Sequence, residues 1–154
     1  MGLRSELDAQ SRAKKMFLDY FVYVMTWNPL AANAVTPVAV PLTSDSDFVL
    51  DGVSLVAYTG VGVLLPNPDY LLQLIDTGSG RNLQDAPVHV NNIAGQGNLL
   101  YILPEPKLFK GGATITGILT NNTAVAARVD IALIGRKIFY LGGYNRETVF
   151  AGYF

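Results

Sequence analysis

The chain has 154 residues, of which 50% are hydrophobic and 15% are charged, and its formal net charge is −1. So much apolar surface excludes a disordered chain, and a charge near zero excludes the broad positive field that binding to nucleic acid or an anionic membrane requires. The absence of cysteine excludes disulfides, thiolate nucleophiles and cysteine-ligated metal sites.

Residues 1–16 are predicted to form an arm or a short helix. Ser5 is a possible N-cap with Asp8 three residues later, and the basic pair Lys14-Lys15 stands near the end. The apolar content is too low for a core element, so two interpretations stay open: a frayed terminus, and an arm that orders on a neighbouring subunit. No uninterrupted apolar run suits a signal peptide or a membrane span, so we expect the protein to mature in the cytoplasm of its producing cell.

Residues 17–141 are predicted to form one all-β domain. Its first strand, Phe17–Met25, is rich in aromatic and β-branched residues at both odd and even positions. Because alternate residues of a strand point to opposite faces, this predicts a strand buried on both faces. Asn28-Pro29 predicts a turn after this strand. Further short strands, separated by Gly, Pro, Asn and Asp, are expected at 36–40, 48–50, 53–58 and 70–75.

The second half of the domain shows the same pattern of short segments between turns. Pro104 and Pro106 must be extended, because each proline fixes its own φ and keeps its predecessor out of the helical region. About eight strands with no strong amphipathic helix between them favour an antiparallel β-sandwich of the jelly-roll type. The remaining strands are expected at 87–90, 99–103, 113–120, 125–134 and 136–141.

Residues 142–154 form an aromatic C-terminal tail in this prediction. The tail begins with Gly142-Gly143, and its aromatic residues are too apolar to prefer water. We expect it to dock, either on its own sandwich or on a neighbouring subunit. The aromatic residues are Tyr144, Phe150, Tyr153 and Phe154.

The segment Asp76-Thr77-Gly78-Ser79, after Leu74-Ile75, resembles the active-site loop of aspartic proteases. Those enzymes use two carboxylates that share a proton, so a chain with one such loop would act as a homodimer, as retroviral proteases do. Leu133-Ile134-Gly135-Arg136 resembles a second feature of those proteases. The same Asp-Thr-Gly-Ser-Gly sequence suits a plain hairpin, in which the aspartate accepts backbone hydrogen bonds and glycine adopts positive φ. We favour the hairpin, expect no catalytic residue, and keep the protease as an alternative.

Other candidate ligand sites are weaker. Asp45, Asp47 and Asp51 have spacings like those of a calcium loop but lack the bidentate glutamate of an EF-hand, so solvated turns are expected. His89 is the only histidine, which supports neither a histidine-rich metal site nor a Ser-His-Asp triad. Gly60-Val61-Gly62 lacks the third glycine and the following helix of a phosphate loop and is predicted to be a turn. No metal or cofactor is expected.

The aromatic first strand suggests a further alternative. Trp27 with Tyr20, Tyr23 and Met25 resembles a sugar-stacking platform, as in the carbohydrate-binding β-sandwich of a phage tail. An aromatic strand of this apolarity is more typical of a core, which is the interpretation that we favour.

A series of short motifs between about Phe17 and Tyr140 carries a broader resemblance. The motifs are Phe17–Met25, Ser44-Asp45-Ser46-Asp47-Phe48, Leu72-Gln73-Leu74-Ile75-Asp76 with Gly80-Arg81, Pro87-Val88, Leu103-Pro104-Glu105-Pro106, Gly112-Ala113-Thr114-Ile115, Thr120-Asn121-Asn122 and Leu133-Ile134-Gly135-Arg136-Lys137. In this order they resemble a family of small tailed-bacteriophage virion proteins that includes capsid decoration, or cement, proteins. The resemblance implies a jelly-roll-like sandwich without cofactor or catalytic residues, in homo-oligomers, often trimers, over junctions between major capsid proteins.

We therefore predict a non-enzymatic structural protein on the capsid exterior of a virion assembled in the host cytoplasm. The low charged fraction agrees with this prediction. In free monomers about a quarter of the residues are usually charged, so we expect part of this chain's surface to contact other proteins. Its partners are the major capsid protein and further copies of itself, and neither nucleic acid nor membrane. Candidate intersubunit contacts are Leu3, Arg4, Leu7, Lys14, Lys15, Tyr144, Phe150, Tyr153 and Phe154.

Overall fold

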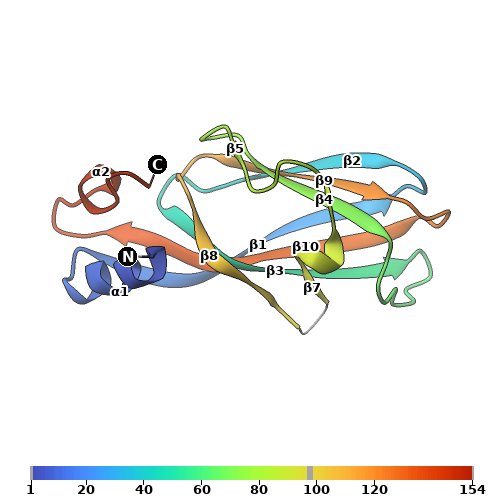
Figure 1. The fold of residues 1–154 in the computed structure, drawn as a ribbon, viewed down its shortest axis with the longest axis horizontal. Coiled ribbons are helices and arrows are strands. Elements are labelled where there is room, and N and C mark those ends of the chain that lie inside the picture. Colours follow the sequence, from blue (N-terminus) through green and yellow to red (C-terminus); the bar gives the residue numbers. More distant parts are fainter. Residues whose placement is uncertain (1, 97–98, 154) are drawn as a thin grey trace.

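The computed structural model describes residues 2–96 and 99–153, and two β-sheets face each other in it (Figure 1). Sheet A has the strand order β1-β10-β3-β7, with β8 also paired to β3. It consists of β1 (Met16–Leu30), β3 (Asp47–Thr59), β7 (Gly95–Gln96), β8 (Tyr101–Phe109) and β10 (Ala127–Tyr140). Sheet B has the order β2-β9-β4-β5, with β6 also paired to β4. It consists of β2 (Val35–Pro41), β4 (Tyr70–Asp76), β5 (Arg81–Asn82), β6 (Val88–His89) and β9 (Thr114–Asn121).

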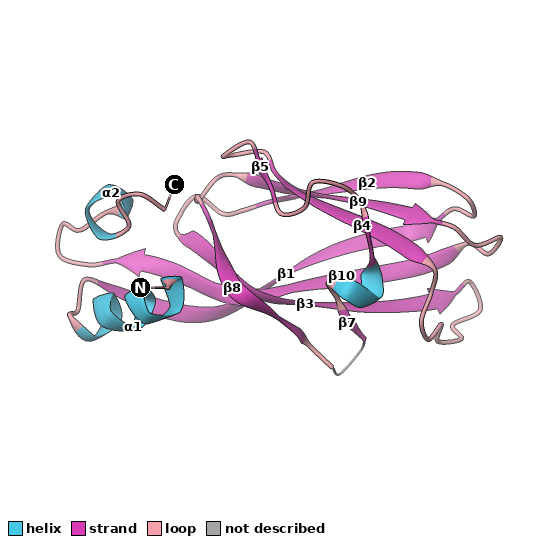
Figure 2. Cartoon of the chain, in the orientation of Figure 1, coloured by secondary structure: helices cyan, strands magenta, loops and turns pink. Residues whose placement is uncertain are grey.

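The order of the strands is that of a jelly roll. The short strands β5 and β6 occupy one position beside β4, and β7 and β8 occupy one position beside β3. Eight strand positions are then divided equally between two antiparallel sheets, with one short parallel contact between β3 and β7. This confirms the predicted all-β sandwich. Helices are confined to the ends and connections: α1 (Leu3–Arg12), the 3-10 turn η1 (Val90–Asn92) and α2 (Arg146–Val149), as Figure 2 shows.

Two predicted strand breaks are wrong, because they are irregularities within long strands. The segments expected at 48–50 and 53–58 form the single strand β3, whose pairing with β8 shifts register between Leu50 and Gly52. The segments expected at 125–134 and 136–141 likewise form β10, with a shift between Ile134 and Gly135. In the pairing of β3 with β10, Asp51 is an extra residue in β3, and such a bulge bends a strand without ending it.

The first strand also differs from its prediction. It runs on to Leu30 through a cis Asn28-Pro29 bond, and the turn comes only at residues 31–34. It is not buried on both faces, because Tyr20 is 69% exposed and Val24 53% exposed. The reason is that β1 is an edge strand whose outer face no other element covers along this stretch.

The main core lies between the two sheets and contains the largest buried side chains, among them Trp27, Phe48 and Tyr70. Trp27 is 1% exposed, and its indole nitrogen donates a hydrogen bond to the Thr36 carbonyl at 2.9 Å, which joins β1 to β2. Gly117 in β9 leaves room for that ring, since a Cβ there would lie 3.1 Å from Trp27. The two sheets thus meet closely where the tryptophan lies.

A second hydrophobic cluster covers the outer face of sheet A at the end where both termini lie (Figure 1). Val49 belongs to it, between Phe48 and Leu50 of the main core, and alternation along a strand places it on the opposite face. The cluster contains Leu3, Leu7, Met16, Val49, Leu108, Ile138, Val149 and Phe150. Both terminal segments therefore dock on the chain's own sandwich. No helix among the described residues is long and apolar enough to cross a membrane.

Candidate functional site

Asp76 stands at the end of β4 and organises the turn into β5. It is 1% exposed, and its carboxylate accepts hydrogen bonds from the Gly78 amide at 2.9 Å and from the Ser79 hydroxyl. Gly80 has φ of 67° and donates its amide to the Asp76 carbonyl. The geometry confirms the hairpin interpretation. Residues 133–136, the second protease-like feature, lie in β10 of the opposite sheet. The homodimeric protease stays an alternative prediction.

The three aspartates at 45–51 point to separate basic partners instead of converging. The Asp51 carboxylate accepts two hydrogen bonds from Arg136, at 2.8 and 2.9 Å. The pKa of Asp45 is lowered, mainly by a hydrogen bond from Thr43. The ion pairs are Asp45–Lys137, Asp47–Arg146 and Asp51–Arg136. Within residues 2–96 and 99–153, no group of three or more His, Cys, Asp or Glu side chains is placed to hold a metal ion.

Asp47 is the buried charge of the molecule's helical end and joins segments far apart in the sequence. It is 1% exposed and accepts hydrogen bonds from Arg146 Nε at 2.9 Å, from the Gly111 amide at 2.8 Å and from the Tyr140 hydroxyl. Burial and the hydrogen bond to Asp47 raise the pKa of Tyr140. The hydrogen bond to Asp47 also raises the pKa of Arg146. This cluster anchors α2, and with it the C-terminal segment, to β3 and β10.

The aromatic residues of β1 belong mostly to the core. Trp27, Tyr23 and Met25 are 1%, 8% and 0% exposed, whereas Tyr20 is 69% exposed. Only one of the four side chains proposed as a sugar-stacking platform is therefore on the surface. The favoured core interpretation of this strand is confirmed for the other three.

The candidate intersubunit residues at the termini make contacts within the chain. Leu3, Leu7 and Phe150 are at most 3% exposed. The others remain partly accessible: Arg4 donates to the Leu103 carbonyl at 2.9 Å, Lys14 is exposed, Lys15 lies over the Tyr144 ring, Tyr144 is 43% exposed and Tyr153 packs on Phe150. Phe154 lies outside the described residues. Contacts of these residues with other subunits stay a prediction.

Three loops meet at the end of the sandwich opposite the helices. Leu30, Ala127 and Thr59 are register neighbours in sheet A, and Tyr70 pairs with Asn121 in sheet B. The loops 31–34, 60–69 and 122–126 therefore emerge side by side, at the right-hand end of Figure 1. We call this surface the loop end.

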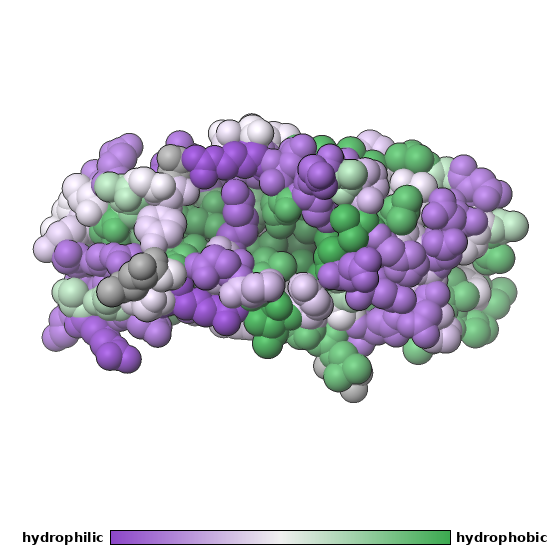
Figure 3. Space-filling view, viewed as in Figure 1, coloured by the Kyte–Doolittle hydropathy of each residue, from purple (hydrophilic) through white to green (hydrophobic). Residues whose placement is uncertain are grey.

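The loop end exposes aliphatic side chains in positions where turns usually carry polar ones. Val61 is 87% exposed, the highest value among the exposed large hydrophobic residues. Figure 3 shows hydrophobic residues at this end of the molecule. Beside them lies a depression of about 620 Å³ lined in part by Pro29, Tyr58 and Arg128. The exposed aliphatic residues are Val35, Val61, Val63, Leu64 and Val125.

This surface was not predicted from the sequence. Gly60-Val61-Gly62 was predicted to be a plain turn, although the valines and leucines around it were a signal. Exposed apolar side chains that cluster in space mark an interaction surface more often than scattered ones do. The loops are more than 25 residues apart in the sequence, and only the strand pairing shows that they lie side by side.

Asn121, buried at the end of β9, joins two of the three loops, and its neighbour Asn122 contacts the third. Its side-chain amide donates to the carbonyls of Ala31 at 3.1 Å and Val125 at 2.9 Å. Its side-chain oxygen accepts from the Thr123 amide at 2.9 Å and the Thr123 hydroxyl at 2.7 Å. The neighbouring Asn122 amide donates to the carbonyl of Asp69. The loop end is thus held by a buried polar network.

Replacing Asn121 with alanine is expected to lower the free energy of unfolding by about 1–3 kcal/mol, because it removes the buried amide that donates to the Ala31 and Val125 carbonyls and accepts from Thr123. Asn121→Asp should cost more, since a carboxylate would face those two carbonyls. Urea denaturation measures both, and the exposed Asn122→Ala serves as a control that should stay within about 0.5 kcal/mol of the wild type. Equal stabilities for the two alanine variants would contradict the role assigned to Asn121.

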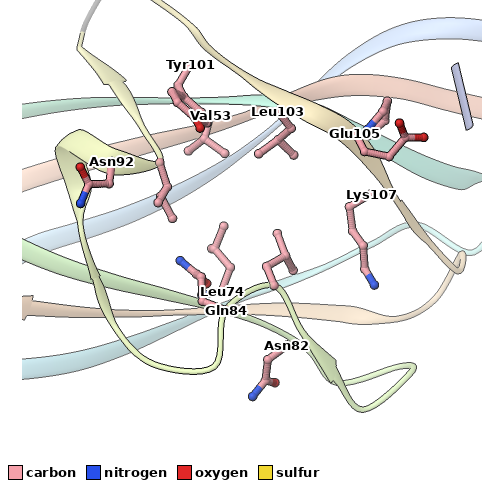
Figure 4. A pocket seen from close by; sticks show the side chains of 12 residues that line it. Val53, Leu74, Asn82, Gln84, Asn92, Tyr101, Leu103, Glu105 and Lys107 are labelled. Carbon is pink, nitrogen blue, oxygen red and sulfur yellow. The ribbon is translucent and has the colours of Figure 1, made fainter. Parts of the chain in front are cut away.

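A cleft of about 400 Å³ opens between the sheets at the β8 side (Figure 4). Val53 and Leu103 of sheet A and Leu74 of sheet B form its apolar walls. Two polar groups at its rim already serve the backbone: Gln84 accepts from the Leu74 amide at 2.8 Å, and Glu105 accepts from the first amide of α1. The cleft is therefore a gap between the two sheets, and the polar side chains at its rim bind the backbone of β4 and α1.

Comparison with protein-family models and with curated proteins finds no match to this chain.

Proposed function

We propose that the chain is a non-enzymatic structural protein of a tailed-phage particle, a decoration subunit that binds the outer surface of the capsid and stabilises contacts between major capsid proteins. The observation that carries the proposal is the loop end, with five exposed aliphatic residues on one end of a β-sandwich. Jelly rolls are a recurrent architecture of viral capsid domains. The sequence resemblance to decoration proteins supports the same assignment.

The loop end suits a shell contact for two physical reasons. An aliphatic side chain that passes from full exposure to full burial contributes about 1.5–3 kcal/mol, so a few of them supply useful affinity. The network around Asn121 also holds the loops before binding, which lowers the entropy cost of forming the complex. In an oligomer, several loop ends would engage the shell together, and the high effective concentration of the later contacts would make release slow.

The test replaces two exposed side chains of one loop, as Val61→Asp with Leu64→Asp, and measures occupancy on purified capsids that lack the protein. Val61 and Leu64 are 87% and 57% exposed, so the change should not disturb the core. We expect the occupancy, measured at a fixed and non-saturating concentration of the decoration protein, to fall at least tenfold. Ile102→Asp is the matched control, because Ile102 is 58% exposed but pairs with Gly52 in the middle of β3, away from the loop end, and it should decorate as the wild type does. Unchanged occupancy of the double variant would overturn the proposal.

A further inference from the structure

The sandwich has four free strand edges, and they differ in their protection. An edge strand presents unpaired N–H and C=O groups on which another chain can pair, and proteins block such edges with proline, charge, short strands or a covering segment. The edges are β1 and β7/β8 in sheet A, and β2 and β5/β6 in sheet B. Three of the four carry such protection.

The edge of β2 is blocked by proline. The Asn121 amide donates to the Ala34 carbonyl and the Leu42 amide to the Ala113 carbonyl, so the even-numbered residues of β2 bond to β9. Because bonded and unbonded positions alternate, the odd-numbered residues face the free edge. These are Val35, Pro37, Ala39 and Pro41. Two of the four have no amide hydrogen to offer.

The β8 and β5/β6 edges are protected in other ways. Strand β8 contains Pro104 and Pro106, and α1 covers it, with Arg4 bonded to the Leu103 carbonyl. Strands β5 and β6 are only two residues each. Neither edge offers a long proline-free run for another strand to pair with.

The edge of β1 is long and open. Strand β1 is 15 residues long, and its only proline is Pro29. Among the described strands it pairs with β10 alone, through 13 residue pairs. The Leu141 amide donates to the Lys15 carbonyl, which fixes the odd-numbered residues as those bonded to β10. The backbone groups of the even-numbered residues therefore point outward. Between Phe17 and Trp27 they are Leu18, Tyr20, Val22, Val24 and Thr26.

We propose that two copies of the chain pair through this edge, β1 antiparallel to β1, around a two-fold axis at Val22. This register uses all five outward-facing residues and forms about ten backbone hydrogen bonds between the copies. It sets Tyr20 of each copy opposite Val24 of the other, an aromatic and β-branched pair of the kind that stabilises antiparallel strands. Both side chains are more than half exposed in the single chain, so the pairing would cover them.

Charge supports self-pairing. Asp19 is the only charged residue between Met16 and Trp27. In the proposed register it falls opposite Met25 of the second copy, so no like charges meet across the interface. The edge is thus complementary to itself, which is what a two-fold contact requires. The contact gives an even-numbered assembly instead of the trimer that the family resemblance implies, and it does not depend on binding to a shell.

The first experiment compares two proline variants by sedimentation velocity. In Val22→Pro the missing amide is one that faces outward, so the ladder with β10 keeps its bonds. Ala39→Pro places proline at the same kind of position on the edge of β2 and is the matched control. We expect the wild type and Ala39→Pro to sediment as dimers and Val22→Pro as a monomer with an unchanged circular dichroism spectrum. A monomeric or trimeric wild type would overturn the proposal.

A second experiment decides the question if Val22→Pro does not fold. The chain has no cysteine, so Val22→Cys carries a single thiol. Two Val22 Cα atoms on the axis would lie about 5.5 Å apart, within the range that a disulfide spans. Mild oxidation should convert most of Val22→Cys to a covalent dimer, at least tenfold faster than Val35→Cys, whose position on β2 is 62% exposed. Equal rates for the two variants would exclude the β1 contact.

Discussion

Replacing Asp47 with alanine is expected to lower the free energy of unfolding by about 3–5 kcal/mol, the usual cost of removing one partner from a buried ion pair. Asp47 is 1% exposed and accepts hydrogen bonds from Arg146, Tyr140 and the Gly111 amide. Alanine removes the acceptor for all three groups. Guanidinium denaturation measures the loss, and the midpoint should fall while the slope stays constant, because the surface exposed on unfolding hardly changes.

Asp45→Ala is the matched control for this prediction. Asp45 is also paired with a basic residue, Lys137 at 3.6 Å, but its side chain is 57% exposed, and exposed pairs contribute about 0–1 kcal/mol. Since Asp47 anchors Arg146, its alanine variant should also make the segment after Tyr140 more sensitive to limited proteolysis. Similar losses for the two variants, or an unchanged cleavage rate at the C-terminal segment, would contradict the anchoring role of Asp47.

The sandwich was predictable because its strands alternate in polarity and its turns contain glycine, proline, asparagine and aspartate. The long strands were not, since Asp51-Gly52 and Gly135 have the composition of turns. Only the pairing of β3 with β10 shows that Asp51 is an extra residue in one continuous strand and that Gly135 lies beside it in the other. Helix α1 looked too polar to pack, yet Leu3 and Leu7 one turn apart suffice when the outer face of sheet A supplies the rest of the cluster.

The candidate site was harder to predict because its residues lie far apart in the sequence. Asp47 and Arg146 are separated by 99 residues, and the loop end joins three loops from separate parts of the sequence. No local pattern encodes such meetings. The sequence motif Thr120-Asn121-Asn122 indicated a turn correctly. It gave no sign that the Asn121 side chain is buried and joins loop 31–34 to loop 122–126, while the Asn122 side chain is exposed.

Replacing Gly135 with alanine is expected to cost at least about 3 kcal/mol, at the upper end of what an extra methyl group costs in a packed interior. A Cβ at this position would lie 1.8 Å from the Val49 carbonyl oxygen and 2.9 Å from the Phe48 ring. The first neighbour is backbone of the paired strand β3, so it cannot move aside as a flexible side chain can. The glycine that resembles a protease motif is thus explained by the close approach of two strands.

Thermal unfolding of Gly135→Ala tests this explanation, with Gly60→Ala as the control. A Cβ at Gly60 would meet nothing within 4 Å. That variant should therefore change the free energy of unfolding by no more than about 0.5 kcal/mol and leave the midpoint temperature almost unchanged. If Gly135→Ala unfolds at the same temperature as Gly60→Ala, the bulge must be able to open without loss of pairing. In that case the close approach of β3 and β10 would not be the reason for a glycine at position 135.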